Sequence, residues 1–363
     1  MFFLVLFLLF LSKRKIIIFV CSSAFLGIVS SLRYNFGADY NAYGLIFNSI
    51  SSGQIKNFNI EPLYGVYNII VHSIGLNYVG FVAFNTFLLL LLFILWIIMS
   101  SDYQYYSFFV YVTFFFLVWN LSTFRQSLAL SLGVLLIYNR KLDFNTLIKF
   151  LIIPILSMFH FSAYFFGVLI LVGSLKWNKK SIAIFFAIGL LYTFLPTQEI
   201  LAQLIHNASL DGVYYIAKVR GYFDNMEFSF GFFNVSSLMR IFFFILVWAH
   251  YEVLRKTKYL QRITNVFLVG MTLYLFLSFN ALFASRLTIY ALILLVILLP
   301  EILAYYEEKK PWMRIAAMSV FIGLCTFMYF KDLYAIKDQL GIDDGKWYVE
   351  YQSILDQDII IEK

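Results

Sequence analysis

Long apolar stretches separated by short polar connections run along almost the whole 363-residue chain. None of them alternates polar and apolar residues as a barrel strand does, whereas a helix pairs its own backbone groups in lipid. The pattern therefore predicts an all-α, polytopic integral membrane protein with about 11–13 transmembrane helices and no soluble domain. The apolar stretches lie at about 2–12, 16–32, 79–99, 104–121, 124–138, 146–159, 160–175, 181–197, 235–250, 263–282, 286–303 and 312–330.

Basic residues in the connections predict which side each one faces, because cytoplasmic loops carry an excess of Lys and Arg. Successive helices then cross the membrane in alternating directions on two conditions. Residues 62–76 must enter the membrane without crossing it or lie at its interface, and residues 146–175 must form two short helices that turn near His160. The loop 33–62, the large loop 198–234 and the tail 331–363 are then expected on the outer face. The basic connections lie at 13–15, 139–141, 176–180, 255–262 and 307–314.

Composition supports the same interpretation. The chain is 62% hydrophobic and 13% charged, whereas a soluble domain is about 25% charged. The net charge of +7 comes from the cytoplasmic loops, so it indicates orientation and no nucleic-acid partner. Cys21 and Cys325 lie in apolar runs and suggest neither a disulfide nor a metal site. Residues 1–12 lack the basic start and cleavage site of a signal peptide, so a short first span or anchor is expected.

Arginines on the predicted outer face are unexpected, since an Arg inside a bilayer costs roughly 2.5–3.5 kcal/mol. One explanation is an anionic ligand. A guanidinium is planar, stays charged and binds two phosphate oxygens at once, and the helix N-termini expected near Arg125 and Arg286 favour anions too. The alternative is that each Arg reaches the lipid headgroups. The residues concerned are Arg33, Arg125, Arg220, Arg240 and Arg286.

Four other polar residues stand out. Asp39 can cap a short helix with Gly37 making the turn, pair with Arg33, or act as a base. Glu61 precedes Pro62, where a helix can begin, so helix-end electrostatics can explain it. Intramembrane His160 is either functional or a hydrogen-bonded packing residue, and Gln126 either orients Arg125 or contacts a ligand.

Several segments together resemble the EpsG-type exopolysaccharide polymerases, relatives of the Wzy O-antigen polymerases. "LRYNFGADYNAY" resembles their R-x-x-x-G-x-D-Y-x-x-Y element, and "EPLYGVYNII" is similar to the E-P segment that follows. "STFRQSLALS" resembles their Arg-Gln helix, "MFHFSAYFF" their F-H-x-S-A segment and "ASRLTIYALILLVILLP" their late Arg-containing helix. The likeness covers most of the chain in the same order, although the first helix is shorter than the family pattern.

The resemblance implies an enzyme of the bacterial cytoplasmic (inner) membrane that joins undecaprenyl-diphosphate-linked oligosaccharide repeats outside the cytoplasm, into O-antigen, capsule or exopolysaccharide. Arg33, Asp39 and Tyr40 would belong to the outer-face signature, and Arg125 with Gln126 would start the central helix. His160 would be the F-H histidine and Arg286 the late arginine. A chain-length regulator and a flippase are partners expected of the family.

A mechanism follows from these residues. Negative charge develops on the leaving diphosphate, and D-x-D occurs only at Asp356 and Asp358 beside the C-terminus. We therefore expect no metal or other cofactor, with arginines acting as fixed cations. His160 is favoured slightly over Asp39 as the base, since His titrates near neutral pH. The predicted diphosphate ligands are Arg33, Arg125, Arg240 and Arg286, and the predicted substrate contacts are Tyr40, Glu61, Gln126 and Arg220.

Three other functions remain open. An O-antigen ligase would use the same donor and a different acceptor. A transporter or flippase would show repeat symmetry and charges through the membrane depth, and the sequence has neither. A membrane O-acyltransferase with His160 as its base would need a site for a cytoplasmic acyl donor, whereas His160 falls on or near the outer side in the predicted topology.

Overall fold

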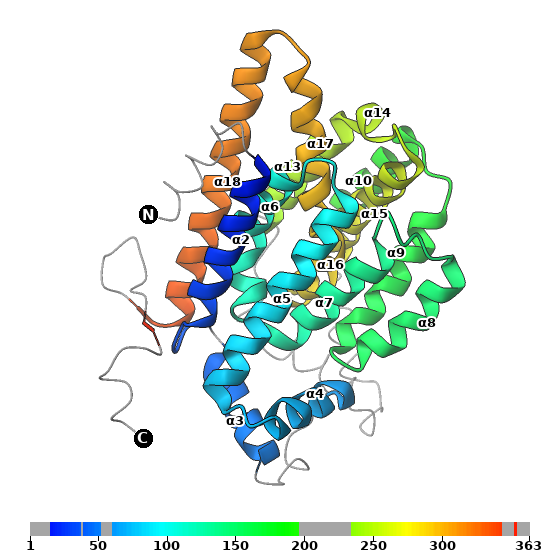
Figure 1. Cartoon of the computed structure of the whole chain (residues 1–363). Coiled ribbons are helices and arrows are strands. Elements are labelled where there is room, and N and C mark those ends of the chain that lie inside the picture. The colour runs from blue at the N-terminus through cyan, green and yellow to red at the C-terminus, as the bar shows by residue number, and fades with distance from the viewer. Residues whose placement is uncertain (1–14, 38, 52–59, 196–233, 343–351, 354–363) are drawn as a thin grey trace, which may run out of the picture. The chain divides into compact units, whose positions relative to one another are not determined.

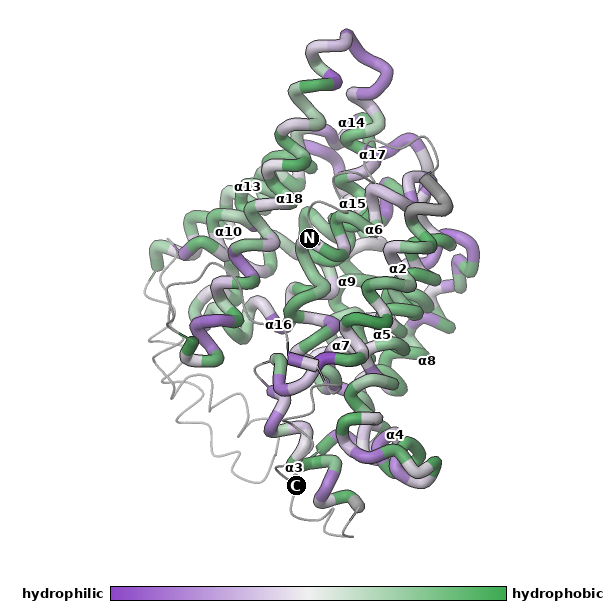
Figure 2. Tube along the Cα trace, turned by 60° about the vertical axis from the view of Figure 1, so that its left-hand side comes forward, coloured by the Kyte–Doolittle hydropathy of each residue, from purple (hydrophilic) through white to green (hydrophobic). Residues whose placement is uncertain are grey.

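The computed structural model describes residues 15–37, 39–51, 60–195, 234–342 and 352–353. Helices make up most of this part of the chain, and its β-structure is one isolated bridge. Figure 2 shows hydrophobic residues along the middles of the helices and hydrophilic residues gathered at many helix ends and connections. The all-α, polytopic membrane fold predicted from the sequence is confirmed.

Two described helices, α5 (Tyr78–Ser100) and α18 (Pro311–Gln339), are long and apolar enough to cross a bilayer. A third span results if α16 (Ala281–Leu292) and α17 (Leu295–Glu307), which meet at a bend of 53°, cross together. The total of 11–13 spans stays a prediction. Shorter apolar helices lie at Phe19–Ser31, Phe124–Ile137, Thr146–Ser157, Phe161–Ser174 and Val235–Ala249.

The chain divides into two compact units, and the first comprises residues 1–164 and 299–363. Within it α5 packs against α2 and α7, and the π-helix η2 packs against α18. Aromatic rings from α3, α4, α5 and α7 form a buried cluster that includes Tyr43, Phe47, Tyr64, Phe81 and Phe124. Besides α5 and α18, its helices (Figure 1) are α2 (Lys15–Ser31), α3 (Tyr40–Ser51), α4 (Pro62–Ser73), α6 (Gln104–Tyr111), η2 (Val112–Asn120), α7 (Phe124–Ile137), α8 (Thr146–Ser157) and η3 (Phe161–Tyr164).

The second unit comprises residues 165–298 and is organised around α15. This helix contacts α9, α10, α13 and α16 and is buried along most of its length. Gly270 lets α15 and α16 approach closely, since a Cβ there would lie 2.2 Å from Ala291 Cβ. Besides α16 and the start of α17, most of which belongs to the first unit, the helices of this unit are α9 (Phe165–Ser174), α10 (Lys179–Tyr192), α13 (Val235–Ala249), α14 (Tyr251–Leu254) and α15 (Lys258–Phe276).

Asparagine caps begin many of these helices. The side chain before the helix accepts a hydrogen bond from the backbone N–H three residues on, which satisfies a donor that the helix cannot. Each such cap contributes about 1 kcal/mol. The capping residues are Asn77, Asn145, Asn178, Asn234 and Asn280, with Thr257 in the same role at α15.

The helix boundaries refine the expectations from the sequence. The stretch 146–175 is broken at His160, as predicted, between α8 and η3. The helix α18 continues to Gln339, past the predicted end of the last apolar run, with Asp332 and Lys337 buried on it. The predicted first span, the large outer loop and most of the C-terminal tail lie outside the described residues.

Candidate functional site

An ion pair between α4 and α7 forms the centre of the candidate site. Arg125 is the second residue of α7, so the predicted placement near a helix N-terminus is confirmed. Its Nη1 lies 2.8 Å from Glu61 Oε2, and the side chains are 23% and 6% exposed respectively. Glu61 is the N-cap residue of α4, yet its side chain makes no capping hydrogen bond. Its carboxylate binds a guanidinium from a distant segment instead.

Two neighbouring tyrosine rings contact this guanidinium. Its carbon lies 5.9 Å from the Tyr43 ring centroid and 6.0 Å from that of Tyr64, within reach of a cation–π interaction. Tyr43 also stacks on Phe124 at 5.0 Å and accepts a hydrogen bond from the Arg125 amide at 3.4 Å. Burial raises the pKa of the Tyr43 phenol above its usual 10, so the side chain is a neutral hydroxyl at pH 7.

Arg33 lies in a separate, fully buried network and is only 3% exposed. Its Nη1 donates to Thr86 Oγ1 at 2.5 Å and to the Ser30 carbonyl at 2.9 Å. Its Nη2 donates to the Leu121 carbonyl at 2.9 Å, and its guanidinium lies 5.6 Å from the Phe124 ring centroid. Arg33 therefore joins the end of α2 to α5 and to the segment that leads into α7.

Gly37 packs against the same segment. Its φ is +119°, and a Cβ there would lie 2.6 Å from the Leu121 carbonyl oxygen. Only glycine meets both conditions without strain. The turn predicted at Gly37 is therefore present, and it leads into α3 through Asp39, whose carbonyl accepts a bond from the Tyr43 amide. Tyr40 is buried, and its carbonyl accepts from the Tyr78 hydroxyl.

His160 lies in the turn between α8 and η3. Its Nδ1 is 2.6 Å from Ser162 Oγ and 3.3 Å from the Ser162 amide. An amide can only donate, so Nδ1 is the accepting nitrogen and the proton of a neutral ring is on Nε2. The first amides of α4, those of Leu63 and Tyr64, donate to the Met158 carbonyl at 2.9 and 3.3 Å. These bonds dock the helix that begins after Glu61 onto the turn that carries His160.

Several buried polar atoms around α4 and α5 make no hydrogen bond within the described part of the chain. They are Arg125 Nε, the Tyr64 hydroxyl, Asn68 Oδ1 and Asn85 Nδ2. Buried polar groups are nearly always paired, and exceptions point to a functional role or a polar ligand. Gln126 is buried beside Arg125 in the sequence, 3% exposed.

Two predicted arginines belong to the second unit. Arg240 on α13 donates to the Ser236 carbonyl and to Ser285 Oγ, both at 3.1 Å, and lies 4.1 Å from the Tyr274 ring centroid. Arg286 follows Ser285 on α16, as the sixth residue of that helix. Arg220 lies outside the described residues. Arg33, Asp39, Tyr40, Glu61, Arg125, Gln126 and His160 all belong to the first unit.

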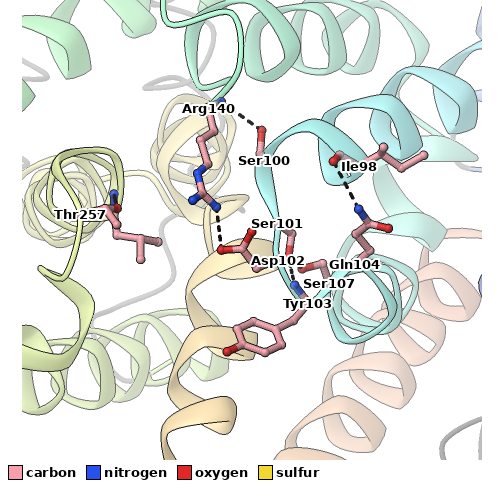
Figure 3. A network of polar contacts seen from close by, with 10 residues as sticks. Ile98, Ser100, Ser101, Asp102, Tyr103, Gln104, Ser107, Arg140 and Thr257 are labelled. Atoms are coloured by element: carbon pink, nitrogen blue, oxygen red, sulfur yellow. Dashed lines mark hydrogen bonds and ion pairs between the residues drawn. The ribbon is translucent and has the colours of Figure 1, made fainter. Parts of the chain in front are cut away.

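A different polar network lies beyond the other end of α7. Figure 3 shows the Arg140 guanidinium pointing at Asp102, with Nη1 and Oδ2 2.6 Å apart. The Arg140 amide donates to Ser100 Oγ at 3.4 Å. The side chains of Arg140 and Asp102 are 41% and 62% exposed, so this ion pair contributes about 0–1 kcal/mol to stability. It belongs to a predicted cytoplasmic loop and provides a comparison for the buried pair of Arg125.

Sequence reasoning missed several residues of this site. Thr86 and Asn85 are polar residues inside the long apolar run of α5, which is a signal for function in membrane helices. Tyr64 carries no such signal, because interface tyrosines are common. Tyr43 is the last residue of the R-x-x-x-G-x-D-Y-x-x-Y element, but its contact with Arg125 could not be read from that motif. Among the described residues, no group of three or more His, Cys, Asp or Glu side chains could hold a metal ion.

Comparison with protein families gives one result, and it covers nearly the whole chain. Neither the curated proteins nor the solved structures searched gave a match. The EpsG family model matches residues 16–353, which include Arg33, Glu61, Arg125 and His160. This family includes Wzy-type polymerases, so the resemblance noted from the sequence motifs is confirmed and a polysaccharide-polymerase-like function is supported. The chain is a multi-pass membrane protein that belongs to the EpsG family.

Proposed function

We propose that this protein is a membrane glycosyltransferase that joins undecaprenyl-diphosphate-linked oligosaccharide repeats into a polysaccharide at the outer face of the bacterial cytoplasmic membrane. The observation that carries the proposal is Arg125. This arginine is at a helix N-terminus, lies against two neighbouring tyrosine rings and has its Nε buried without a described partner. A guanidinium so placed is suited to the diphosphate of a lipid-linked sugar.

The reaction breaks the bond between the anomeric carbon of the growing glycan and its lipid diphosphate. The hydroxyl of an incoming repeat attacks that carbon and loses a proton, and the diphosphate leaves with an additional negative charge. Arg125 would stabilise this charge, in the way that fixed donors stabilise a developing oxyanion. Loss of one such donor costs roughly 2.7–4 kcal/mol of barrier, which corresponds to a rate lower by about 10²–10³.

Glu61 would come to lie beside the substrate when Arg125 binds the diphosphate. In the described state the carboxylate occupies one side of the guanidinium. A diphosphate that binds Nε and the remaining Nη would share the guanidinium with Glu61 or displace it. Either event leaves the Glu61 carboxylate beside the substrate, which agrees with its predicted place among the substrate contacts.

His160 is proposed as the base that takes the acceptor proton. With Nδ1 accepting from Ser162, the ring of the neutral side chain carries its proton on Nε2. His160 can take the acceptor proton only after a tautomer change or a shift of the Ser162 bond, so Ser162 sets the ring orientation from which this step starts. Asp39 stays the alternative base. Tyr40 and Gln126, both buried, would contact the substrate only after a local rearrangement, whereas Arg33 acts from a distance through Leu121.

The arginines of the second unit are proposed to contact diphosphate as well. Arg240 and Arg286 are carried by α13 and α16, with Ser285 linking the two positions. Arg220 is proposed as a substrate contact from the sequence alone. The lipid tail would stay in the bilayer, no metal or other cofactor is required, and a chain-length regulator and a flippase are the expected partners.

A glycan ladder on a gel tests the proposal. A deletion strain, the same strain with the gene restored, and strains with Arg125→Ala or Arg286→Ala are compared at equal membrane levels. Arg140→Ala is the matched control, because it removes an arginine from the other end of α7. The polymerase function predicts a ladder that collapses to a single repeat in the deletion strain and in both site variants, and a normal ladder with Arg140→Ala.

Other results would point elsewhere. If no repeat is attached at all, an O-antigen ligase or a flippase of lipid-linked oligosaccharide explains the phenotype better. If the deletion leaves the ladder intact, polymerisation of that glycan is excluded.

A further inference from the structure

Residues close to the C-terminus pair with the backbone of the signature element near the N-terminus. Arg33 and Ser353 form an antiparallel bridge, and the Tyr34 amide donates to the Gln352 carbonyl at 2.9 Å. Figure 1 shows this pairing, with the short red arrow of the tail beside the blue end of α2. We propose that Gln352 and Ser353 are positioning residues for the diphosphate site, an inference that rests on the polymerase function proposed above.

The first step of the argument is the geometry of the bridge. Residues directly opposite in an antiparallel pair have fixed Cα positions, about 4.5–5.5 Å apart. The tail therefore determines where the Arg33 backbone lies. The tail pairs with the Arg33 backbone, while the Arg33 side chain reaches Thr86 on α5.

The second step connects Arg33 to α7. Leu121 is the C-cap of η2, and Arg33 donates to its carbonyl. A basic side chain on the last carbonyls of a helix satisfies them and opposes the helix dipole. Thr123, the N-cap of α7, follows two residues later and Arg125 four residues later. The position of Arg33 thus affects where the N-terminus of α7, and with it Arg125, is held.

A third observation comes from the family comparison. The match to the EpsG family does not stop at the end of α18, at Gln339, but continues to Ser353. The tail up to the bridge is therefore part of the family domain, whereas residues 354–363 lie beyond it. A chain that lacks residues 354–363 is therefore a suitable control for one that also lacks the bridging residues.

Two pairs of variants test the proposal. A chain that ends at Gly341 loses the bridge to Arg33, whereas one that ends at Ser353 keeps both bridging residues. Tyr34→Pro removes the N–H that donates to Gln352 together with the Tyr34 ring, and the extended conformation that a residue before proline prefers suits Arg33 in a bridge. Tyr34→Ala is its control, because it loses the ring contact with Tyr40 and keeps the N–H.

The assay measures chain extension in membranes against the concentration of lipid-linked repeat. We expect the chain ending at Gly341 and Tyr34→Pro to lower kcat/KM roughly tenfold or more, through a higher KM as well as a lower maximal rate. A displaced Arg125 would bind the diphosphate less tightly and stabilise its developing charge less well. The chain ending at Ser353 and Tyr34→Ala should match the wild type.

Two results would overturn the inference and leave the polymerase function standing. One is normal extension by both test variants. The other is a lower maximal rate at unchanged KM, which would assign the tail to folding alone. If the full-length chain itself extends nothing, the polymerase function fails first and the positioning role falls with it.

Discussion

The pair of Arg125 and Glu61 allows a ligand-binding arginine to be separated from a structural one. We consider Arg125→Gln, Glu61→Gln and the double variant. A structural arginine becomes dispensable once its partner is neutral. An arginine that binds diphosphate stays necessary whatever is done to Glu61.

The structure sets the size of the stability effects. Breaking a buried ion pair costs about 3–5 kcal/mol, mainly because the remaining charge is left without a partner. Arg125→Gln leaves Glu61, which is 6% exposed, so we expect a loss of about 3–4 kcal/mol. Glu61→Gln leaves Arg125, which is 23% exposed and contacts two tyrosine rings, so about 1–2 kcal/mol is expected. In the double variant two neutral amides remain, and stability should return to within about 1 kcal/mol of the wild type.

Two measurements on the same four proteins complete the test. Denaturant unfolding in detergent micelles gives the free energies and the coupling between the two residues. Glycan ladders from the corresponding strains report polymerisation. We expect the double variant to recover stability and to leave the ladder at a single repeat. A double variant that restores both stability and ladder would refute the assignment of Arg125 as a diphosphate ligand.

Three further predictions concern other parts of the site. Gly37→Ala should destabilise the protein by about 1–3 kcal/mol, because alanine is strained at this φ and its Cβ would meet the Leu121 carbonyl; thermal unfolding measures this, and an unchanged midpoint would contradict it. His160→Ala should slow chain extension by about 10²–10⁴ and Ser162→Ala by less, since serine only orients the ring; equal losses would favour a structural role for the turn. Extension in washed membranes should be unaffected by EDTA, and inhibition that Mg²⁺ or Mn²⁺ reverses would refute the metal-independent mechanism.

Much of the fold could be predicted because lipid leaves few choices. An apolar run in a bilayer must be a helix, and the predicted runs correspond to α2, α5, α7, α8, α10 and α13 within a few residues. The run at 312–330 was too short because hydropathy alone defined it. The segment after it, FKDLYAIKDQ, alternates charged and apolar residues, and α18 continues through it with Asp332 and Lys337 on the packed side.

The candidate site was predictable in its residue types and only partly in its partners. The position of Arg125 near the N-terminus of α7 could be predicted from the start of the apolar run at 124–138. The contact with Glu61 did not, because the two residues are far apart in the sequence and come together only when α4 docks on the turn at Met158. The partners of Arg33 could not be predicted for a similar reason. A lone arginine at a helix end suggests a ligand, whereas its hydrogen bonds to Thr86 and Leu121 depend on tertiary packing.

The bridge between Arg33 and Ser353 also bears on how the protein is made. Arg33 leaves the ribosome early, while its bridge partner Ser353 is synthesised much later. At about 5–20 residues per second, roughly 15–60 s separate the two. During that time Arg33 can reach Thr86 and Leu121 as α5 and α7 enter the membrane, but its backbone has no partner from the tail. On the positioning role proposed for Gln352 and Ser353, a nascent chain in which these two residues have not yet been made would bind lipid-linked sugar weakly, and full activity would begin only after they join the bridge.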